Sequence, residues 1–133
     1  MQRHGSGGPW EEAVGYSRVV RAGDLVFVAG CTAATPEGAV IGGDSMLDQT
    51  RAAISAVCAA LERVGAGPAD VVQTRLSLTD ISRWAEAGRA HGEVFGDVRP
   101  AAAMVGVSGL IDPRLLVEVE ATAFAPLGAH PGD

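Results

Sequence analysis

Near the start of the chain, two runs of strand-forming residues on either side of a turn predict a pair of strands. Residues 16–21 and 25–29 are rich in β-branched and aromatic side chains, and they flank the turn Ala22-Gly23-Asp24. Two such runs around a Gly/Asp turn are typical of a β-hairpin. The second run is apolar on both faces, which is typical of a central strand covered on both sides. Gly30 ends it, and a glycine-rich loop follows in residues 31–43.

The period of the pattern then changes, which predicts two helices. From Asp44 or Ser45 to Val64, apolar side chains recur at steps of three and four, as on one face of an amphipathic helix. Asp44 or Ser45 can cap the first turn, and the segment Gly65-Ala66-Gly67-Pro68 ends the helix. Asp80 or Ser82 begins a second helix that extends to about residue 95. Its stripe consists of Trp84, Gly88, His91 and Phe95.

Three further segments have the period of strands. Residues 71–79 alternate, so we expect Val72, Thr74, Leu76 and Leu78 on one face and Val71, Gln73, Arg75 and Ser77 on the other. Residues 101–108 and 115–125 are the last two strands. The order β-β-α-β-α-β-β, with both helices on one face of a mixed sheet, predicts an α+β domain.

The last strand carries acidic residues on one face only. Val117, Val119 and Ala121 lie on one face, and Glu118 and Glu120 lie on the other. We expect the apolar face to pack against the helices. The face without helices must then be solvated or covered by another subunit.

Length and composition define the class of protein. The 133 residues form one domain over 1–133, with a core at about 15–125 and loose N- and C-terminal ends, the last of them 129–133. Hydrophobic residues make up 47% of the chain and charged residues 20%, enough apolar surface for a core. The net charge of -6 has the wrong sign for binding nucleic acid or an anionic membrane.

The sequence contains no apolar targeting segment and no cysteine motif that points to an oxidising compartment. The first nine residues contain no apolar targeting segment, and no apolar run reaches the roughly 18–20 residues of a membrane helix. The two cysteines, Cys31 and Cys58, form no CxxC motif. We therefore predict a cytoplasmic protein with no membrane partner.

Several side chains could carry chemistry, and each has a simpler interpretation. Glu118 and Glu120 lie about 6–7 Å apart along a strand, so each could raise the pKa of the other if water is excluded, and one could then act as a general acid or base. The simpler interpretation is that both are solvated acids on the strand face. Cys31 could be a nucleophile or a passive small residue, whereas Cys58 belongs to the core. His91 could carry protons or pack beside Trp84 in the stripe of the second helix.

Metal and nucleotide sites have no support in the sequence. No His/Asp/Glu spacing fits a metal triad, and Gly42-Gly43 lacks the lysine and the context of a phosphate loop. We therefore expect no cofactor and no metal.

Seven short motifs, in order and at the right spacing, resemble one known family. They are Gly15-Tyr16-Ser17, the hairpin of residues 21–30, Asp48-Gln49-Thr50-Arg51, Asp70-Val71-Val72, Leu78-Thr79-Asp80, Arg99-Pro100-Ala101 and Val117-Glu118-Val119-Glu120-Ala121. They cover about residues 15–124 and resemble the Rid/YjgF proteins, known as reactive intermediate/imine deaminases and formerly as L-PSP endoribonucleases. The resemblance implies the chorismate-mutase-like α+β fold and a homotrimer with a barrel of sheets and a small-molecule cleft at each subunit interface.

The resemblance also implies site residues. Tyr16, Gly30 and Glu118 match cleft positions of the imine deaminases, where water is activated to hydrolyse imines. The arginine that binds the substrate carboxylate in those enzymes is replaced by Ala102, and the asparagine of the second helix is replaced by Gly88. Losing charge-assisted hydrogen bonds worth about 1.5–3 kcal/mol each disfavours 2-imino acids as substrates.

Two functions remain open. It also remains open whether Arg99 or Arg75 replaces the arginine that is absent at Ala102. In the first, Glu118 is a general acid/base in an apolar cleft lined by Tyr16, Cys31, Ala102 and Met104, and it acts on an imine, an enamine or a related labile metabolite. In the second, the homotrimer binds a small molecule or a partner enzyme without chemistry.

Overall fold

The computed structural model describes residues 1–127 and contains one six-stranded mixed sheet. The strand order is β1-β2-β3-β6-β4-β5, in which β4 and β5 are parallel and every other neighbouring pair is antiparallel. The strands are β1 Gln2–His4, β2 Val19–Ala22, β3 Leu25–Cys31, β4 Val71–Leu78, β5 Ala101–Gly106 and β6 Val117–Phe124. The helices are α1 Pro9–Val14, α2 Met46–Glu62 and α3 Trp84–Phe95, with short 3-10 turns η1 Pro68–Asp70 and η2 Ile81–Arg83.

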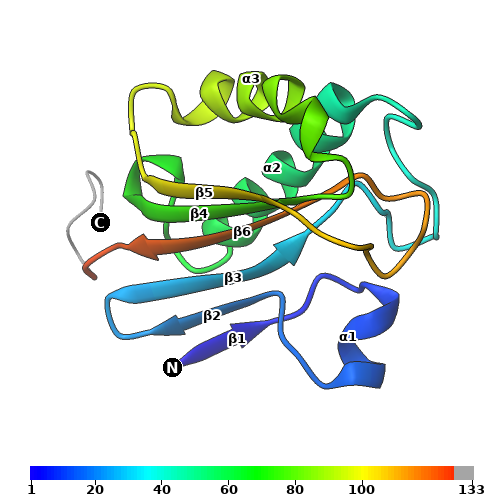
Figure 1. Cartoon of the computed structure of the whole chain (residues 1–133). Coiled ribbons are helices and arrows are strands. Elements are labelled where there is room, and N and C mark those ends of the chain that lie inside the picture. The colour runs from blue at the N-terminus through cyan, green and yellow to red at the C-terminus, as the bar shows by residue number, and fades with distance from the viewer. Residues whose placement is uncertain (128–133) are drawn as a thin grey trace.

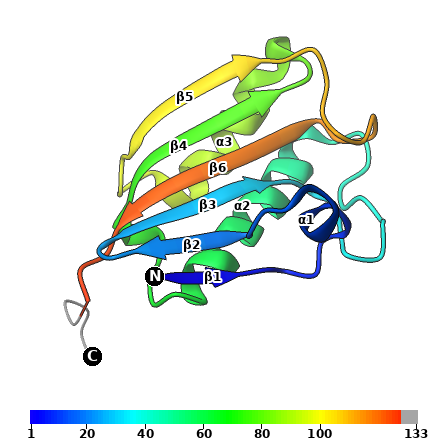
Figure 2. The ribbon, with the colours of Figure 1, turned by 90° about the horizontal axis from the view of Figure 1, so that it is seen from below.

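The two long helices cover one face of the sheet. Figures 1 and 2 show α2 and α3 on the same side and α1 beyond the ends of β1 and β2. The opposite face carries no helix, and we call it the open face. This arrangement confirms the predicted α+β fold.

Helix α2 forms where the hydrophobic period predicts it. The Ser45 hydroxyl caps its first turn by accepting a hydrogen bond from the Asp48 amide (3.1 Å). Its inner face is fully buried at Ala53, Ile54 and Leu61, which pack in the core between helix and sheet. Burying each large aliphatic side chain stabilises the fold by about 1.5–3 kcal/mol relative to leaving it exposed.

Strand β6 occupies the middle of the sheet, between β3 and β4. Val117, Val119 and Ala121 are buried toward the helices. Glu118 and Glu120 are half-buried on the open face, as the alternation predicts. The same face exposes Leu25, paired across the ladder with Phe124, and nearby Phe27.

The predicted faces of β4 are correct except at its start. Val71 is 3% exposed and Val72 is 48% exposed, the reverse of the prediction. The pairing with β6 shifts register between Val71 and Gln73, and a bulge of this kind turns the preceding side chains to the other face. Thr74, Leu76 and Leu78 share one face, as predicted, and that face is buried.

The N-terminal segment, predicted as a loose end, contains strand β1 and helix α1. Strand β1 pairs with β2. The buried carboxylate of Glu11, in α1, accepts hydrogen bonds from the Ser6 amide (2.9 Å), the Ser6 hydroxyl (2.5 Å) and the Gly8 amide (3.2 Å). These bonds fold residues 5–11 into a turn, and the first strand of the predicted hairpin begins only at Val19.

Two other expectations concern the C-terminal tail and the absence of a membrane helix. The predicted loose tail 129–133 lies outside the described residues. No helix within residues 1–127 is both long enough and apolar enough to cross a membrane.

Candidate active site

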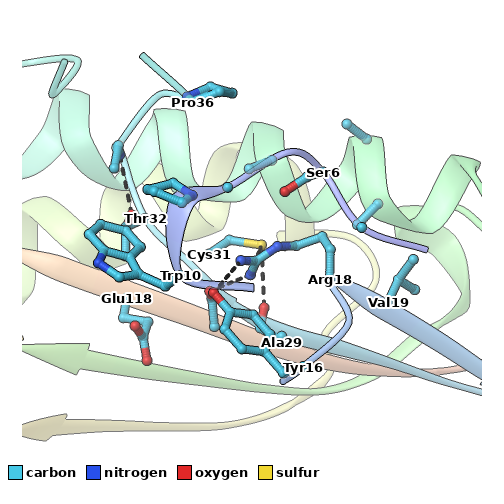
Figure 3. A pocket seen from close by; sticks show the side chains of 18 of the residues that line it. Ser6, Trp10, Tyr16, Arg18, Val19, Ala29, Cys31, Thr32, Pro36 and Glu118 are labelled. Carbon is cyan, nitrogen blue, oxygen red and sulfur yellow. Dashed lines mark hydrogen bonds between the residues drawn. The ribbon is translucent and has the colours of Figure 1, made fainter. Parts of the chain in front are cut away.

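A cavity of about 600 Å³ lies beside the end of β3 (Figure 3). Its walls come from the N-terminal segment with Trp10 of α1, from the approach to β2, from the start of the loop after β3, and from the outer alanines of α2. Tyr16, Arg18, Cys31 and Glu118 provide its main polar groups. A mostly apolar cavity of this size with a few convergent polar groups fits a small molecule.

Glu118 reaches this cavity across Gly30. Figure 3 shows the Glu118 side chain pointing away from α2. A methyl group on Gly30 would lie 2.5 Å from the Glu118 carboxyl carbon and 2.8 Å from its Cγ. Only a glycine at position 30 therefore lets the carboxyl group lie against the backbone of β3 in this position.

The surroundings of Glu118 favour its neutral form. Burial raises the pKa of Glu118 above its ordinary value of 4.5, and the neighbouring Glu120 carboxylate raises it further. The Arg18 guanidinium lowers it in part. A raised pKa brings a carboxyl group closer to the range in which it can both donate and accept a proton.

The same shift predicts how stability depends on pH. Because the pKa of Glu118 is higher in the folded protein than in the unfolded chain, ionising Glu118 destabilises the fold as pH rises from about 4.5 through the raised pKa. We expect Glu118→Gln to have little effect on stability at pH 4 and to stabilise the protein relative to wild type at pH 7.5. Urea denaturation of both proteins at the two pH values tests this, and a stability difference that does not change with pH would contradict it.

Arg18 connects the polar groups of the cavity. One Nη donates to the Gly30 carbonyl (2.5 Å) and to Cys31 Sγ (3.7 Å), and the other donates to the Tyr16 hydroxyl (3.2 Å). The second Nη also lies 3.6 Å from the Glu11 carboxylate. Figure 3 shows the guanidinium between the Tyr16 hydroxyl and the Cys31 sulfur.

Glu11 is the counterion of Arg18 and joins the N-terminal segment to the cavity. Burial by itself raises the pKa of Glu11, but the hydrogen bonds from Ser6 and Gly8 and the charge of Arg18 outweigh it, so the net pKa is lowered. Glu11 is therefore ionised at neutral pH. The charge of Arg18 is largely balanced within the protein.

Cys31 has the features of a passive residue. Its thiol donates to the Ala29 carbonyl (3.3 Å) while its sulfur accepts from Arg18. Burial raises the pKa of Cys31, and the nearby Arg18 offsets only part of this effect. Since the thiolate is the nucleophile, these contacts do not favour covalent catalysis by Cys31.

The other predicted site residues lie elsewhere in the single chain. Gly88, Ala102 and Met104 line a smaller hollow of about 130 Å³ between α3 and the edge strand β5. His91 lines it too, hydrogen-bonded to the Thr74 hydroxyl (2.9 Å), so the packed interpretation of His91 agrees with the structure. Burial lowers the pKa of His91. The single chain thus divides the predicted cleft residues between two places.

Neither proposed substitute for the missing arginine lines the larger cavity. Arg99 has a positive φ of 56° and its Nε donates to the Gly96 carbonyl (3.3 Å). Arg75 is exposed on the open face, opposite Glu120 in the ladder. Two arginines, Arg18 and Arg63, line the cavity, and Arg18 is the one close to Tyr16 and Glu118.

Sequence reasoning missed three residues of this site: Trp10, Glu11 and Arg18. Only Arg18 had a visible signal, since it follows Tyr16 by two residues on an extended segment and shares its side. Trp10 and Glu11 lie before residue 15, in the segment that is predicted as a loose end. Among residues 1–127 no group of three His, Cys, Asp or Glu side chains is placed to hold a metal ion.

Fold and site together define a class: an α+β protein with helices on one face of its sheet and a small-molecule cavity that ends at a carboxyl group. The family model described as "Endoribonuclease L-PSP" matches residues 10–125. The chain therefore belongs to the Rid/YjgF family, and the recognition made from its motifs is confirmed.

Individual relatives support the same conclusion. A protein of Streptomyces coelicolor is 40% identical over 93% of this chain and 92% of its own length. The crystal structure of a YjgF/YER057c/UK114 family member from Mycobacterium tuberculosis has a TM-score of 0.84 and 48% identity, covering 93% of this chain and 98% of that one. The chloroplastic Reactive Intermediate Deaminase A of Arabidopsis thaliana is 27% identical over 80% of this chain and 58% of that protein.

Proposed function

We propose that the protein is an imine- or enamine-hydrolysing enzyme of the Rid/YjgF type, with Glu118 as its general acid/base. The observation that carries this proposal is the half-buried Glu118 carboxyl, which has a raised pKa and lies at the wall of a small-molecule cavity beside Tyr16. The deaminase name of a relative supports the reaction class. A cytoplasmic location, predicted from the sequence, belongs to the same proposal.

The proposed reaction needs one proton carrier and one water. Glu118 in its neutral form protonates the imine nitrogen and becomes a carboxylate. That carboxylate takes a proton from the water whose oxygen bonds to the imine carbon. The resulting amino alcohol then loses ammonia as its C–N bond breaks and its hydroxyl becomes a carbonyl, with Glu118 returning the proton to the leaving nitrogen and receiving the hydroxyl proton.

The complete site is proposed to lie between the subunits of a homotrimer. Glu118 is only half-buried in the single chain, and the open face beside it exposes Leu25, Phe27 and Phe124. Exposed apolar side chains of this size on a helix-free sheet favour association. A neighbouring copy would then complete each cleft with its own Ala102 and Met104.

The trimer can be tested by mass. Light scattering of the purified protein should give about three times the 13.5 kDa of one chain. Leu25→Glu together with Phe27→Glu should lower that mass toward a monomer, because two charges would be buried in the interface. A wild-type monomer at micromolar concentration would contradict both the trimer and the interface site.

The reaction is tested with two imines that differ in charge. Phenylmethanimine can be formed from benzylamine by a flavin amine oxidase, and 2-iminopropionate from D-alanine by D-amino-acid oxidase. We expect faster ammonia release from phenylmethanimine when the protein is added, and release from 2-iminopropionate near background because Ala102 cannot hold a carboxylate. Ala102→Arg should restore part of the second activity. Rapid release from 2-iminopropionate by wild type would mean that another group binds the carboxylate.

A binding protein without chemistry is the alternative. The replacement of the family's arginine by Ala102 favours it, because that arginine holds the substrate in the imine deaminases that the sequence resembles. Such a protein would accelerate neither reaction.

A further inference from the structure

The donors and acceptors around Arg18 determine which hydrogen-bonding group the cavity offers to a ligand. A guanidinium has N–H donors and no acceptor. Because Arg18 donates to the Tyr16 oxygen, the Tyr16 hydrogen cannot point back at Arg18. No acceptor in the described part of the chain takes that hydrogen, so it is free for a ligand.

The other polar groups near Arg18 are already engaged. The Gly30 carbonyl accepts from Arg18, and the Cys31 thiol donates to the Ala29 carbonyl. Tyr16 is therefore the oriented donor at this end of the cavity. Glu118 makes no hydrogen bond within residues 1–127 and is the proton donor or acceptor beside it.

The charges of the cavity do not favour an anionic ligand. Both Nη atoms of Arg18 already contact other groups, namely Gly30, Cys31, Tyr16 and Glu11. Arg18 therefore has no free pair of N–H groups with which to bind both oxygens of a ligand carboxylate. Glu118 adds a negative charge whenever it is ionised. Arg63, the second arginine that lines the cavity, is solvent-exposed and donates to the Gly5 carbonyl (2.6 Å).

We propose that Arg18 is a positioning residue that makes Tyr16 the hydrogen-bond donor of the site, and that the cavity selects ligands with an apolar body and an uncharged oxygen or nitrogen acceptor. The proposal deepens the function proposed above and rests on it for the identity of the site. It names the substrate class as neutral imines or enamines that carry such an acceptor in place of a carboxylate.

Three bicyclic probes of nearly equal size test the selection. They are indane, which has no polar group, 1-indanone, which adds a neutral acceptor, and 1-indanecarboxylate, which adds a charge. Titrations followed by the amide NMR signals of Gly30 and Cys31 locate binding to this cavity. We expect 1-indanone to bind about five- to tenfold more tightly than indane, the range of one hydrogen bond, and the carboxylate to bind more weakly than 1-indanone.

Variants separate the role of Tyr16 as the hydrogen-bond donor from the role of Arg18 as the residue that orients it. Tyr16→Phe should abolish the preference for 1-indanone over indane. Arg18→Gln should reduce it although Tyr16 remains, because the glutamine oxygen can accept the Tyr16 hydrogen, whereas Arg18→Lys, which has donors only, should preserve it. Thermal unfolding followed by circular dichroism shows which variants fold, and Tyr16→Phe keeps the test decisive if an Arg18 variant does not.

Four results would overturn the proposal: equal binding of indane and 1-indanone, a preference that survives Tyr16→Phe, tightest binding of the carboxylate, or no binding of any probe. These measurements need no turnover. A protein that prefers 1-indanone through Tyr16 but releases no ammonia would refute the proposed function while leaving this inference standing.

Discussion

Replacing Glu118 by glutamine should lower the rate of ammonia release from a neutral imine by about 10²-fold or more, the scale of a lost general acid or base. Glutamine has nearly the same size and can keep the contact with Gly30, but it cannot exchange a proton at neutral pH. We therefore expect the fold and the oligomeric mass to stay unchanged. Turnover, circular dichroism and light scattering of the same preparation test the three expectations together.

Glu120 provides the matched control for this prediction. It lies on the same strand and the same face as Glu118, but it does not line the cavity. Glu120→Gln should therefore reduce turnover far less. Equal losses in both variants, or no loss in either, would remove Glu118 from the catalytic role and favour the binding protein.

A second large effect is expected at Gln49, which is fully buried in the first turn of α2. Its amide nitrogen donates to the carbonyls of Gly43 (2.7 Å) and Arg114 (3.0 Å), and its oxygen accepts from the Leu116 amide (2.9 Å). Gln49→Met keeps the volume but leaves three backbone groups without their partner. At about 1–3 kcal/mol for each unpaired buried group, partly offset by water, we expect the free energy of unfolding to fall by about 2–4 kcal/mol.

Urea denaturation measures this change, and an exposed residue of the same helix is the control. Arg51 pairs with Glu93 (2.6 Å) on the surface, where such pairs contribute little to stability, so Arg51→Ala should leave the denaturation midpoint nearly unchanged. A Gln49→Met midpoint equal to that of wild type would show that its hydrogen bonds do not stabilise the fold. Because Leu116 precedes Glu118 by two residues, we also expect this variant to lower turnover.

The sequence predicts the elements whose period is set by burial. Helix α2 buries one continuous face and β6 buries every second residue, so hydrophobic spacing alone locates both. It fails at the start of β4, where the register shift exchanges Val71 and Val72. Alternation assumes an unbroken ladder, and nothing in the apolar pattern marks where an extra residue is accommodated.

Only part of the candidate site was predictable, because some of its residues are brought together by side-chain contacts that leave no pattern in the sequence. The alternation of the last strand places Glu118 and Glu120 on one face, whereas the family resemblance singles out Glu118 and Gly30 as site residues. The links of Arg18 to Glu11 and to Cys31 join different structural elements, through an ion pair and a hydrogen bond rather than through burial. Side-chain hydrogen bonds between separate segments leave no period, so these partners emerge only when the backbone is folded.

The ion pair between Glu11 and Arg18 connects the N-terminal segment to the cavity. The family model begins at residue 10, whereas Gly5, Ser6, Gly8 and Pro9, which line the cavity, precede it. One wall of the cavity therefore comes from residues that lie outside the span matched by the family model. We expect these first residues to determine part of the ligand preference, so exchanging them for the matching residues of a relative should change which molecules bind while the sheet and Glu118 stay the same.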